Sequence, residues 1–273
     1  MSFASSQAPS YTLDAALLHR IERRIASFAG QPIPLLPTSL TRPSPSHASS
    51  TPSAASASAP RTAAVLIPLC TAHGQASLLY QIRTASVSTH KGQVSFPGGH
   101  ILPNEAPAQA ALREFYEEMA GDPRGGQGVP QSSTPSDRSH SKADGAAAPR
   151  IGPISILAAC EPLPAVTGTV VHPFLALLHR DVGDLAHFSP DPSEVAGIFT
   201  LSLAQLLDPA LAGREDLEGG GRKRLNVPFF EGGPAKVWGF TAYITEGVLE
   251  SVLRPCLGGG GEVGGEGGKQ GET

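Results

Sequence analysis

The sequence predicts an α/β fold in which helices cover both faces of a mixed β-sheet. Two strand-like apolar runs come first, a strongly patterned helix lies near the middle of the chain, and further strand-like runs precede a last helix. Elements in this order pack as layers, because each apolar face of a sheet needs a cover. With 273 residues, 40% of them hydrophobic, the chain can bury one good core or two small ones.

Residues 1–30 contain the first expected element, an amphipathic helix within residues 12–29. Arg20, Arg23 and Arg24 would also suit a mitochondrial presequence, whereas Asp14 and Glu22 count against one. We favour a helix that docks on the domain through its apolar stripe. Residues 31–60 are rich in Pro, Ser and Ala and predict a disordered linker, because such a segment buries too little apolar surface to offset its ordering entropy.

Residues 61–255 are expected to form the folded domain, and Trp238, the only tryptophan, is expected to pack in its core. Residues 122–150 are a low-complexity tract and predict a disordered insertion, and residues 256–273 predict a frayed glycine-rich tail. Helices are expected at Leu203–Leu207 and over about Ala242–Leu253. The strand-like runs are Thr62–Leu69, Ser77–Ile82, Gln93–Phe96, Ile154–Ala159, Val170–Leu178, Val195–Leu201 and Lys236–Phe240.

The most strongly patterned stretch is the central helix. Asn104 is a favourable N-cap residue, and Pro107 falls in the first turn, where its missing N–H costs nothing. One apolar stripe at helical spacing is expected to face the core. It consists of Ala108, Ala111, Leu112, Phe115 and Met119.

Three carboxylates, Glu114, Glu117 and Glu118, fall together on a different face of this helix. Like charges at this spacing repel, and no lysine follows on that face. A divalent cation would neutralise them, and carboxylate oxygens suit hard Mg²⁺ or Mn²⁺. On the helix alone, an acidic solvated face is the favoured alternative.

The residues before the helix favour the metal site over a solvated face. Gly98-Gly99 lets the backbone approach a ligand at the loop between strand and helix. Gly99, then Glu105, then Arg113-Glu114-x-x-Glu117-Glu118 together resemble the Nudix box. The family has glycine where this chain has Ala120, although Gly121 can still supply the helix C-cap. The resemblance implies a Nudix-type α/β/α sandwich and hydrolysis of a nucleoside diphosphate linked to another group.

A second resemblance lies in segments around the box. These segments are Leu78–Arg83, His90–Gly99, Pro164–Gly168, Val171–Pro173, Ser193–Val195, Phe199, Pro228–Phe230 and Trp238–Ala242. They are similar to those of coenzyme A pyrophosphatases within the Nudix family, although Gln81 and Ser88 depart from that subfamily, which has a threonine and a basic residue there. This resemblance implies cleavage of coenzyme A or acyl-CoA to 3′,5′-ADP and a 4′-phosphopantetheine compound. The alternatives are a Nudix hydrolase for ADP-ribose or NADH, and a non-catalytic scaffold.

The resemblance also implies roles for individual residues. The metal ligands would be Glu114, Glu117 and Glu118, with the carbonyl of Gly98 as a backbone ligand. The general base would be Glu114 or Glu194. Arg113 would hold a carboxylate in position, with Glu105 as the favoured partner. Candidates for binding the substrate are Arg83, His90 and Lys91, since basic side chains suit phosphate.

Composition narrows the partners and the compartment. A net charge of −4 gives no electrostatic case for nucleic-acid binding, and no apolar run is long enough to span a bilayer. Cys70, Cys160 and Cys256 are odd in number and far apart, which predicts free thiols in an intracellular, reducing compartment, the first two of them in the core. Mitochondrial and peroxisomal addresses both stay open, and the sequence says nothing of oligomeric state.

Overall fold

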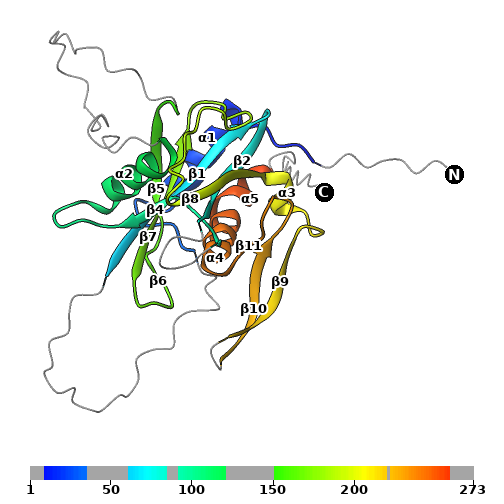
Figure 1. The fold of residues 1–273 in the computed structure, drawn as a ribbon. Helices are drawn as coiled ribbons and strands as arrows, with labels where there is room; N and C mark the ends of the chain where they lie inside the picture. Colours follow the sequence, from blue (N-terminus) through cyan, green and yellow to red (C-terminus); the bar gives the residue numbers. More distant parts are fainter. Residues whose placement is uncertain (1–8, 36–60, 85–91, 121–150, 220–221, 259–273) are drawn as a thin grey trace, which may run out of the picture.

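Figure 1 shows the fold of a computed structural model, which describes residues 9–35, 61–84, 92–120, 151–219 and 222–258. For residues 217–219 and 222–225 it describes the backbone only. Within these residues, no helix is long and apolar enough to cross a membrane.

One mixed sheet forms the centre of the domain. Its strand order is β3-β2-β1-β7-β5, with β4 paired to β1, β6 to β7 and β8 to β2. β1 is parallel to β7, whereas the other pairs are antiparallel, so the predicted mixed sheet is confirmed. The strands are β1 (Thr62–Ala72), β2 (Gln75–Arg83), β3 (Val94–Ser95), β4 (Gly98–His100), β5 (Ile154–Ala159), β6 (Leu163–Pro164), β7 (Val170–Leu178) and β8 (Val195–Ser202).

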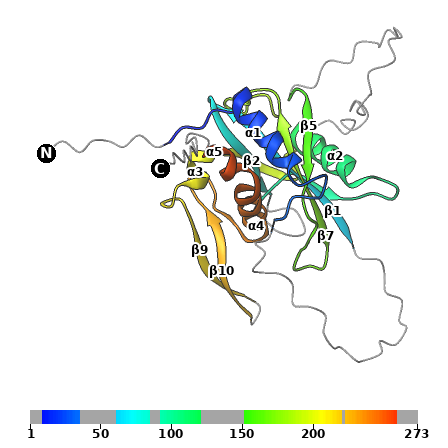
Figure 2. The same cartoon turned by 180° about the vertical axis from the view of Figure 1, so that it is seen from behind.

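Helices cover both faces of this sheet, as Figures 1 and 2 show. On one face lies α2 (Pro107–Ala120), and on the other lie α1 (Ala15–Ala26), α3 (Leu203–Leu207), α4 (Gly239–Val248), the π-helical turn η2 (Leu249–Leu253) and α5 (Arg254–Leu257). Successive side chains of β2 therefore enter two different cores: Leu79 packs in the core of α2, whereas Leu78 and Tyr80 pack in the core of α4. The predicted α/β/α sandwich is confirmed.

Helix α1 docks on the domain, as expected. Its N-cap Asp14 accepts a hydrogen bond from the Leu17 N–H (2.7 Å), and Leu17 and Ile21 are buried. Arg20 Nε donates to the Cys256 carbonyl (2.8 Å) and Arg24 Nε to the Ser251 carbonyl (2.7 Å). Ser251 lies in the π-helical turn η2, and residue 255, whose N–H an α-helix would offer to this carbonyl, is a proline. Arg24 supplies a side-chain donor to this carbonyl.

The linker predicted for residues 31–60 is wrong at its start. Ile33 forms a β-bridge to Cys160, and both Ile33 and Leu35 are buried. A Cβ at Gly247 of α4 would overlap the backbone of Leu35, which shows how closely this segment packs. These two apolar side chains give the segment enough buried surface to be ordered, whereas residues 36–60 and the insertion at 122–150 lie outside the described residues.

The glycine-rich tail predicted for residues 256–273 starts too early in the sequence, because Cys256 is buried within α5. Cys70, Cys160 and Cys256 are all free and buried, in agreement with the sequence.

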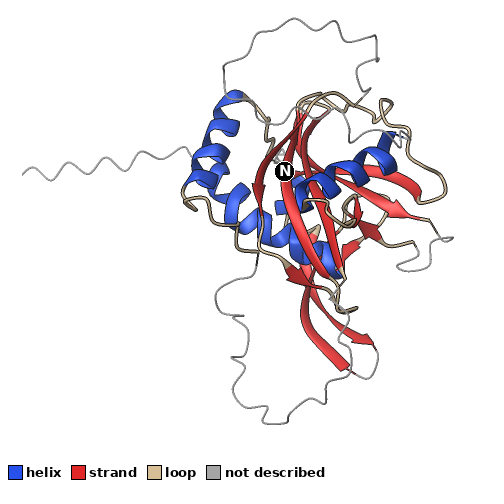
Figure 3. Cartoon of the chain, turned by 90° about the vertical axis from the view of Figure 1, so that its left-hand side faces the viewer, coloured by secondary structure: helices blue, strands red, loops and turns tan. Residues whose placement is uncertain are grey.

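A hairpin of β9 (Ala212–Gly219) and β10 (Arg222–Phe230) was not expected from the sequence. With β11 (Val237–Trp238) it forms a second, three-stranded sheet that projects from the main body (Figure 3). The strand expected at Lys236–Phe240 is cut short because Gly239, with φ of +64°, already begins α4. The core position expected for Trp238 is wrong, since this side chain is 39% exposed.

Candidate active site

A pair of glycines brings the chain against α2. Gly98 and Gly99 lie in β4, which pairs with β1 at Val65 and Ala64. Gly98 has φ of +154°, and a Cβ there would overlap the Ala64 carbonyl and Val65. A Cβ at Gly99 would overlap the carboxylate of Glu114. Only glycine fits these two positions, so the sequence interpretation of close backbone approach is confirmed.

Helix α2 begins later than expected. Asn104 does not cap it: this residue lies in a preceding turn with φ of +63°, and the helix starts at Pro107. The Leu102 N–H donates to Glu105 Oε2 (2.9 Å), so Glu105 organises that turn. The expected apolar stripe faces the core, with Ala111, Leu112, Phe115 and Met119 buried and Ala108 packed beside them.

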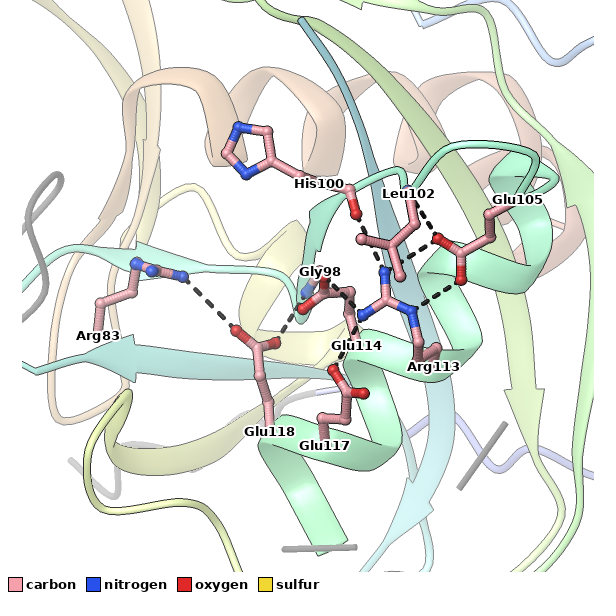
Figure 4. Close-up of polar contacts among 9 residues, drawn as sticks. All are labelled: Arg83, Gly98, His100, Leu102, Glu105, Arg113, Glu114, Glu117 and Glu118. Carbon is pink, nitrogen blue, oxygen red and sulfur yellow. Dashed lines mark hydrogen bonds and ion pairs between the residues drawn. The ribbon is translucent and has the colours of Figure 1, made fainter. Parts of the chain in front are cut away.

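Arg113 connects the turn to two of the helix carboxylates (Figure 4). Its Nε and Nη2 donate to the two oxygens of Glu105 (2.7 and 3.0 Å), a bidentate pair. Its Nη1 donates to Glu114 Oε1 and Glu117 Oε2 (2.9 Å each), and Nη2 also donates to the His100 carbonyl (3.0 Å). The expected contact with Glu105 is therefore present. These bonds to Arg113 lower the pKa of Glu105.

Glu118 is the most buried carboxylate of the three, with 3% of its surface exposed. Its Oε2 accepts from the Gly98 N–H (2.8 Å) and its Oε1 from Gln81 Nε2 (3.0 Å), and Arg83 Nη1 lies 3.6 Å from Oε1. Burial raises the pKa of Glu118 to about 7, against the effect of these donors. Burial likewise raises the pKa of Glu114, against the opposing effect of Arg113.

The loop before β8 meets the last turn of α2. The Ser189 N–H donates to the Met119 carbonyl (2.9 Å) and the Asp191 N–H to the Glu118 carbonyl (3.0 Å). These are carbonyls that the end of a helix leaves unpaired. Gly121, the expected C-cap, lies outside the described residues. The loop therefore fixes Asp191 and Glu194 close to the carboxylates of the helix.

A small pocket results that is lined by five carboxylates: Glu114, Glu117, Glu118, Asp191 and Glu194. This donor set fits a hard divalent cation, because it consists of oxygen ligands alone and carries negative charge that needs neutralising. As they stand, no three acidic, histidine or cysteine side chains in the described residues already converge on one metal position. Carboxylate oxygens of the three helix glutamates instead accept hydrogen bonds from Arg113, Gln81 and the Gly98 N–H.

The structure thus brings together most of the site residues expected from the sequence, while His90 and Lys91 lie outside the described residues. Sequence reasoning missed two others. Asp191 precedes Glu194 by three residues in a short polar turn before a strand, and Gln81 is a polar residue within an apolar strand. The second signal was visible in the sequence, because a buried polar side chain needs a partner.

Comparisons with known proteins indicate the family of the chain. The model of the NUDIX domain matches residues 60–141. The chain is 34% identical to the mitochondrial coenzyme A diphosphatase NUDT8 of Mus musculus, over 72% of this chain and 80% of that protein. It is also 34% identical to the Homo sapiens protein of that name, over 72% and 71% respectively. Identity to the uncharacterized Nudix hydrolase NudL of Escherichia coli (strain K12) is 29%, over 71% of this chain and 85% of that one.

An α/β/α sandwich with a pocket lined by carboxylates is the arrangement that these comparisons have to explain. The chain belongs to the Nudix hydrolase family.

Proposed function

We propose that this Nudix hydrolase cleaves the pyrophosphate bond of coenzyme A or its derivatives, giving 3′,5′-ADP and a 4′-phosphopantetheine compound. The pocket of five carboxylates on α2 and the loop before β8 supports the reaction type. Similarity to NUDT8 coenzyme A diphosphatases over 72% of the chain supports the substrate.

Glu114, Glu117 and Glu118, with the carbonyl of Gly98, are the proposed ligands of a divalent cation. Mg²⁺ and Mn²⁺ both suit this oxygen donor set. When bound, such a cation stabilises charge that develops on the pyrophosphate and lowers the pKa of an attacking water. Arg113 fixes two of the ligands by one nitrogen, Nη1, and is itself fixed by the bidentate pair with Glu105.

The proton of the attacking water needs an acceptor, for which we propose Glu114 or Glu194. Both line the pocket. Arg113 donates to Glu114 and leaves its second oxygen, Oε2, for such a role. Arg83 lies 3.6 Å from Glu118 and is the proposed contact for a substrate phosphate, together with His90 and Lys91.

We further propose that the domain expected at residues 61–255 extends to Leu257, and that α1 and the segment at Ile33 and Leu35 belong to its core. A mitochondrial location is supported by the names of the two mammalian relatives. Fractionation of cells that express the chain tests this location, and the chain should occur in the same fraction as a mitochondrial matrix marker.

Product analysis tests the reaction. The full chain is incubated with coenzyme A, ADP-ribose and NADH in parallel, with Mg²⁺ or Mn²⁺ and with a chelator. We expect 3′,5′-ADP, formed fastest from coenzyme A and abolished by the chelator. Glu117→Gln should abolish turnover, whereas Glu22→Gln on the exposed side of α1 should not change it.

The other outcomes separate the alternatives. Faster turnover of ADP-ribose or NADH would retain the chemistry and reject the coenzyme A substrate. Absence of turnover of all three substrates with either metal would reject the proposed activity and leave the scaffold interpretation. Activity that survives Glu117→Gln would reject the proposed role of Glu117 as a metal ligand.

A further inference from the structure

Gln81 is a buried polar residue in the middle of the main sheet. It lies in β2 between Ser95 of β3 and Ile198 of β8, and none of its surface is exposed. Its side chain points to the face of the sheet that α2 covers, since it contacts Glu118. A polar group in such a place costs free energy unless its hydrogen bonds are made.

The amide nitrogen of Gln81 makes its hydrogen bonds, whereas the amide oxygen makes none. Its Nε2 donates to Glu118 Oε1 (3.0 Å) and to Ser95 Oγ (3.3 Å), so both N–H groups have partners. Its Oε1 has no partner and is the one buried side-chain nitrogen or oxygen atom among the described residues for which this is so. Buried polar atoms in folded proteins are almost always paired, so this exception needs an explanation.

Turning the amide over would not remove the conflict. The amide oxygen would then face Glu118 Oε1, and two acceptors would meet where a donor and an acceptor meet now. The present orientation satisfies the carboxylate at the expense of the amide oxygen. The side chain of Gln81 therefore satisfies the carboxylate of Glu118 and leaves its own amide oxygen without a hydrogen bond.

We propose that Gln81 is a positioning residue, which holds the carboxylate of Glu118 in the orientation that binds a divalent cation. The inference rests on the proposed function, in which Glu118 is a metal ligand. Gln81 fixes Oε1 and the Gly98 N–H fixes Oε2. Each carboxylate oxygen has two lone pairs, so both oxygens keep one for a cation. Loss of a group that orients a metal ligand typically weakens metal binding 10- to 100-fold.

Gln81→Met tests this role, because Met has a similar length but neither the donor nor the unpaired oxygen. We expect Mn²⁺ to bind about tenfold more weakly to the full-length variant, as measured without substrate by the electron paramagnetic resonance signal of free Mn²⁺. The melting temperature of the metal-free protein should stay close to that of wild type, because removal of the unpaired amide oxygen offsets loss of the donor to Glu118 Oε1. Gln75→Met at the start of the same strand, where the side chain pairs with Ser10, is the matched control and should leave Mn²⁺ affinity unchanged.

Ser95→Ala gives a second variant, which keeps Gln81 but removes the other partner of its amide. We expect a smaller loss of Mn²⁺ affinity, about two- to threefold, with the fold intact.

Unchanged Mn²⁺ affinity in both variants would overturn the proposed role of Gln81 and leave the proposed function standing. A wild-type chain that binds no Mn²⁺ would instead reject the metal site itself, and the inference with it.

Discussion

Gly99 and Glu114 are in such close contact that the backbone of β4 sets the position of the carboxylate. A methyl group at residue 99 would occupy the space of that carboxylate. We expect Gly99→Ala to displace Glu114, to lower the free energy of unfolding by about 1–3 kcal/mol and to reduce turnover at least tenfold. Chemical denaturation and initial rates of hydrolysis measure the two effects.

Gly197→Ala in β8 is the control for this change. The nearest heavy atom to a Cβ there is Ile82 Cδ1 at 3.9 Å, an ordinary contact. Unfolding free energy and rate should both stay near the wild-type values. An equal loss in both variants would show that Gly99 matters for general reasons of backbone conformation.

Arg113 illustrates why a guanidinium is needed at this point. One side chain donates to Glu105, Glu114, Glu117 and the His100 carbonyl, and a lysine ammonium cannot reproduce that planar fork. We expect Arg113→Lys to reduce kcat at least tenfold although the charge is kept. Steady-state kinetics with coenzyme A test this, and rates equal to wild type would contradict a positioning role.

The ion pair of Glu105 has a consequence for acid stability. Hydrogen bonds from Arg113 lower the pKa of Glu105 in the folded protein below its ordinary value of 4.5. The stabilisation is therefore present above about pH 4.5 and is lost as the pH falls through the folded pKa. We expect Glu105→Gln to melt at a lower temperature than wild type at pH 7, and the difference to shrink below pH 4. A difference that does not depend on pH would contradict this assignment.

At the scale of residues, the sequence predicted the charged contacts within α2 better than those between elements. Arg113 and Glu105 are eight positions apart, on α2 and in the turn before it, and the resemblance to the Nudix box implied their pairing. Gln81 and Glu118 are 37 positions apart and meet only because β2 packs under α2. Such a contact depends on tertiary structure, and no local pattern predicts it.

At the scale of elements, α1 is part of the domain. Ile21 is fully buried in the same core as α4, and Arg20 and Arg24 donate to carbonyls of the C-terminal helices. We expect Ile21→Ala to cost about 2–5 kcal/mol of unfolding free energy, whereas Glu22→Ala on the exposed side should cost little. Urea denaturation measures both. Equal stability of the two variants would mean that α1 docks only weakly.

The hairpin of β9 and β10 shows which elements a sequence pattern misses. Its first strand carries Arg214, Glu215 and Asp216 in a row, and consecutive glycines follow in the sequence, so no apolar alternation marks it as a strand. Partners from distant segments stabilise it: Arg214 pairs with Glu246, and Lys236 pairs with Glu215 and lies 4.1 Å from the ring centroid of Phe229. By contrast, β5 and β7 have the bounds expected from their apolar runs.

At the scale of the whole molecule, the main sheet separates two hydrophobic cores that support different elements. One core supports α2 and the carboxylate pocket, and the other holds α1, α4 and α5. We expect Ile244→Val in α4 to cost about 0.5–1.5 kcal/mol of unfolding free energy while Mn²⁺ affinity stays within about twofold of wild type. Thermal denaturation and Mn²⁺ titration give the two values. A parallel loss of affinity would show that the sheet transmits strain between its faces.

The contact of Arg24 with the Ser251 carbonyl bears on how the chain is made. Helix α1 leaves the ribosome more than 200 residues before the carbonyls of Ser251 and Cys256 that its arginines bind. During synthesis, α1 has no completed surface on which to pack, and Leu17 and Ile21 stay without their partners in the C-terminal helices. The domain can therefore close only after its C-terminal helices have been translated, and α1 is among the last of the described elements to pack.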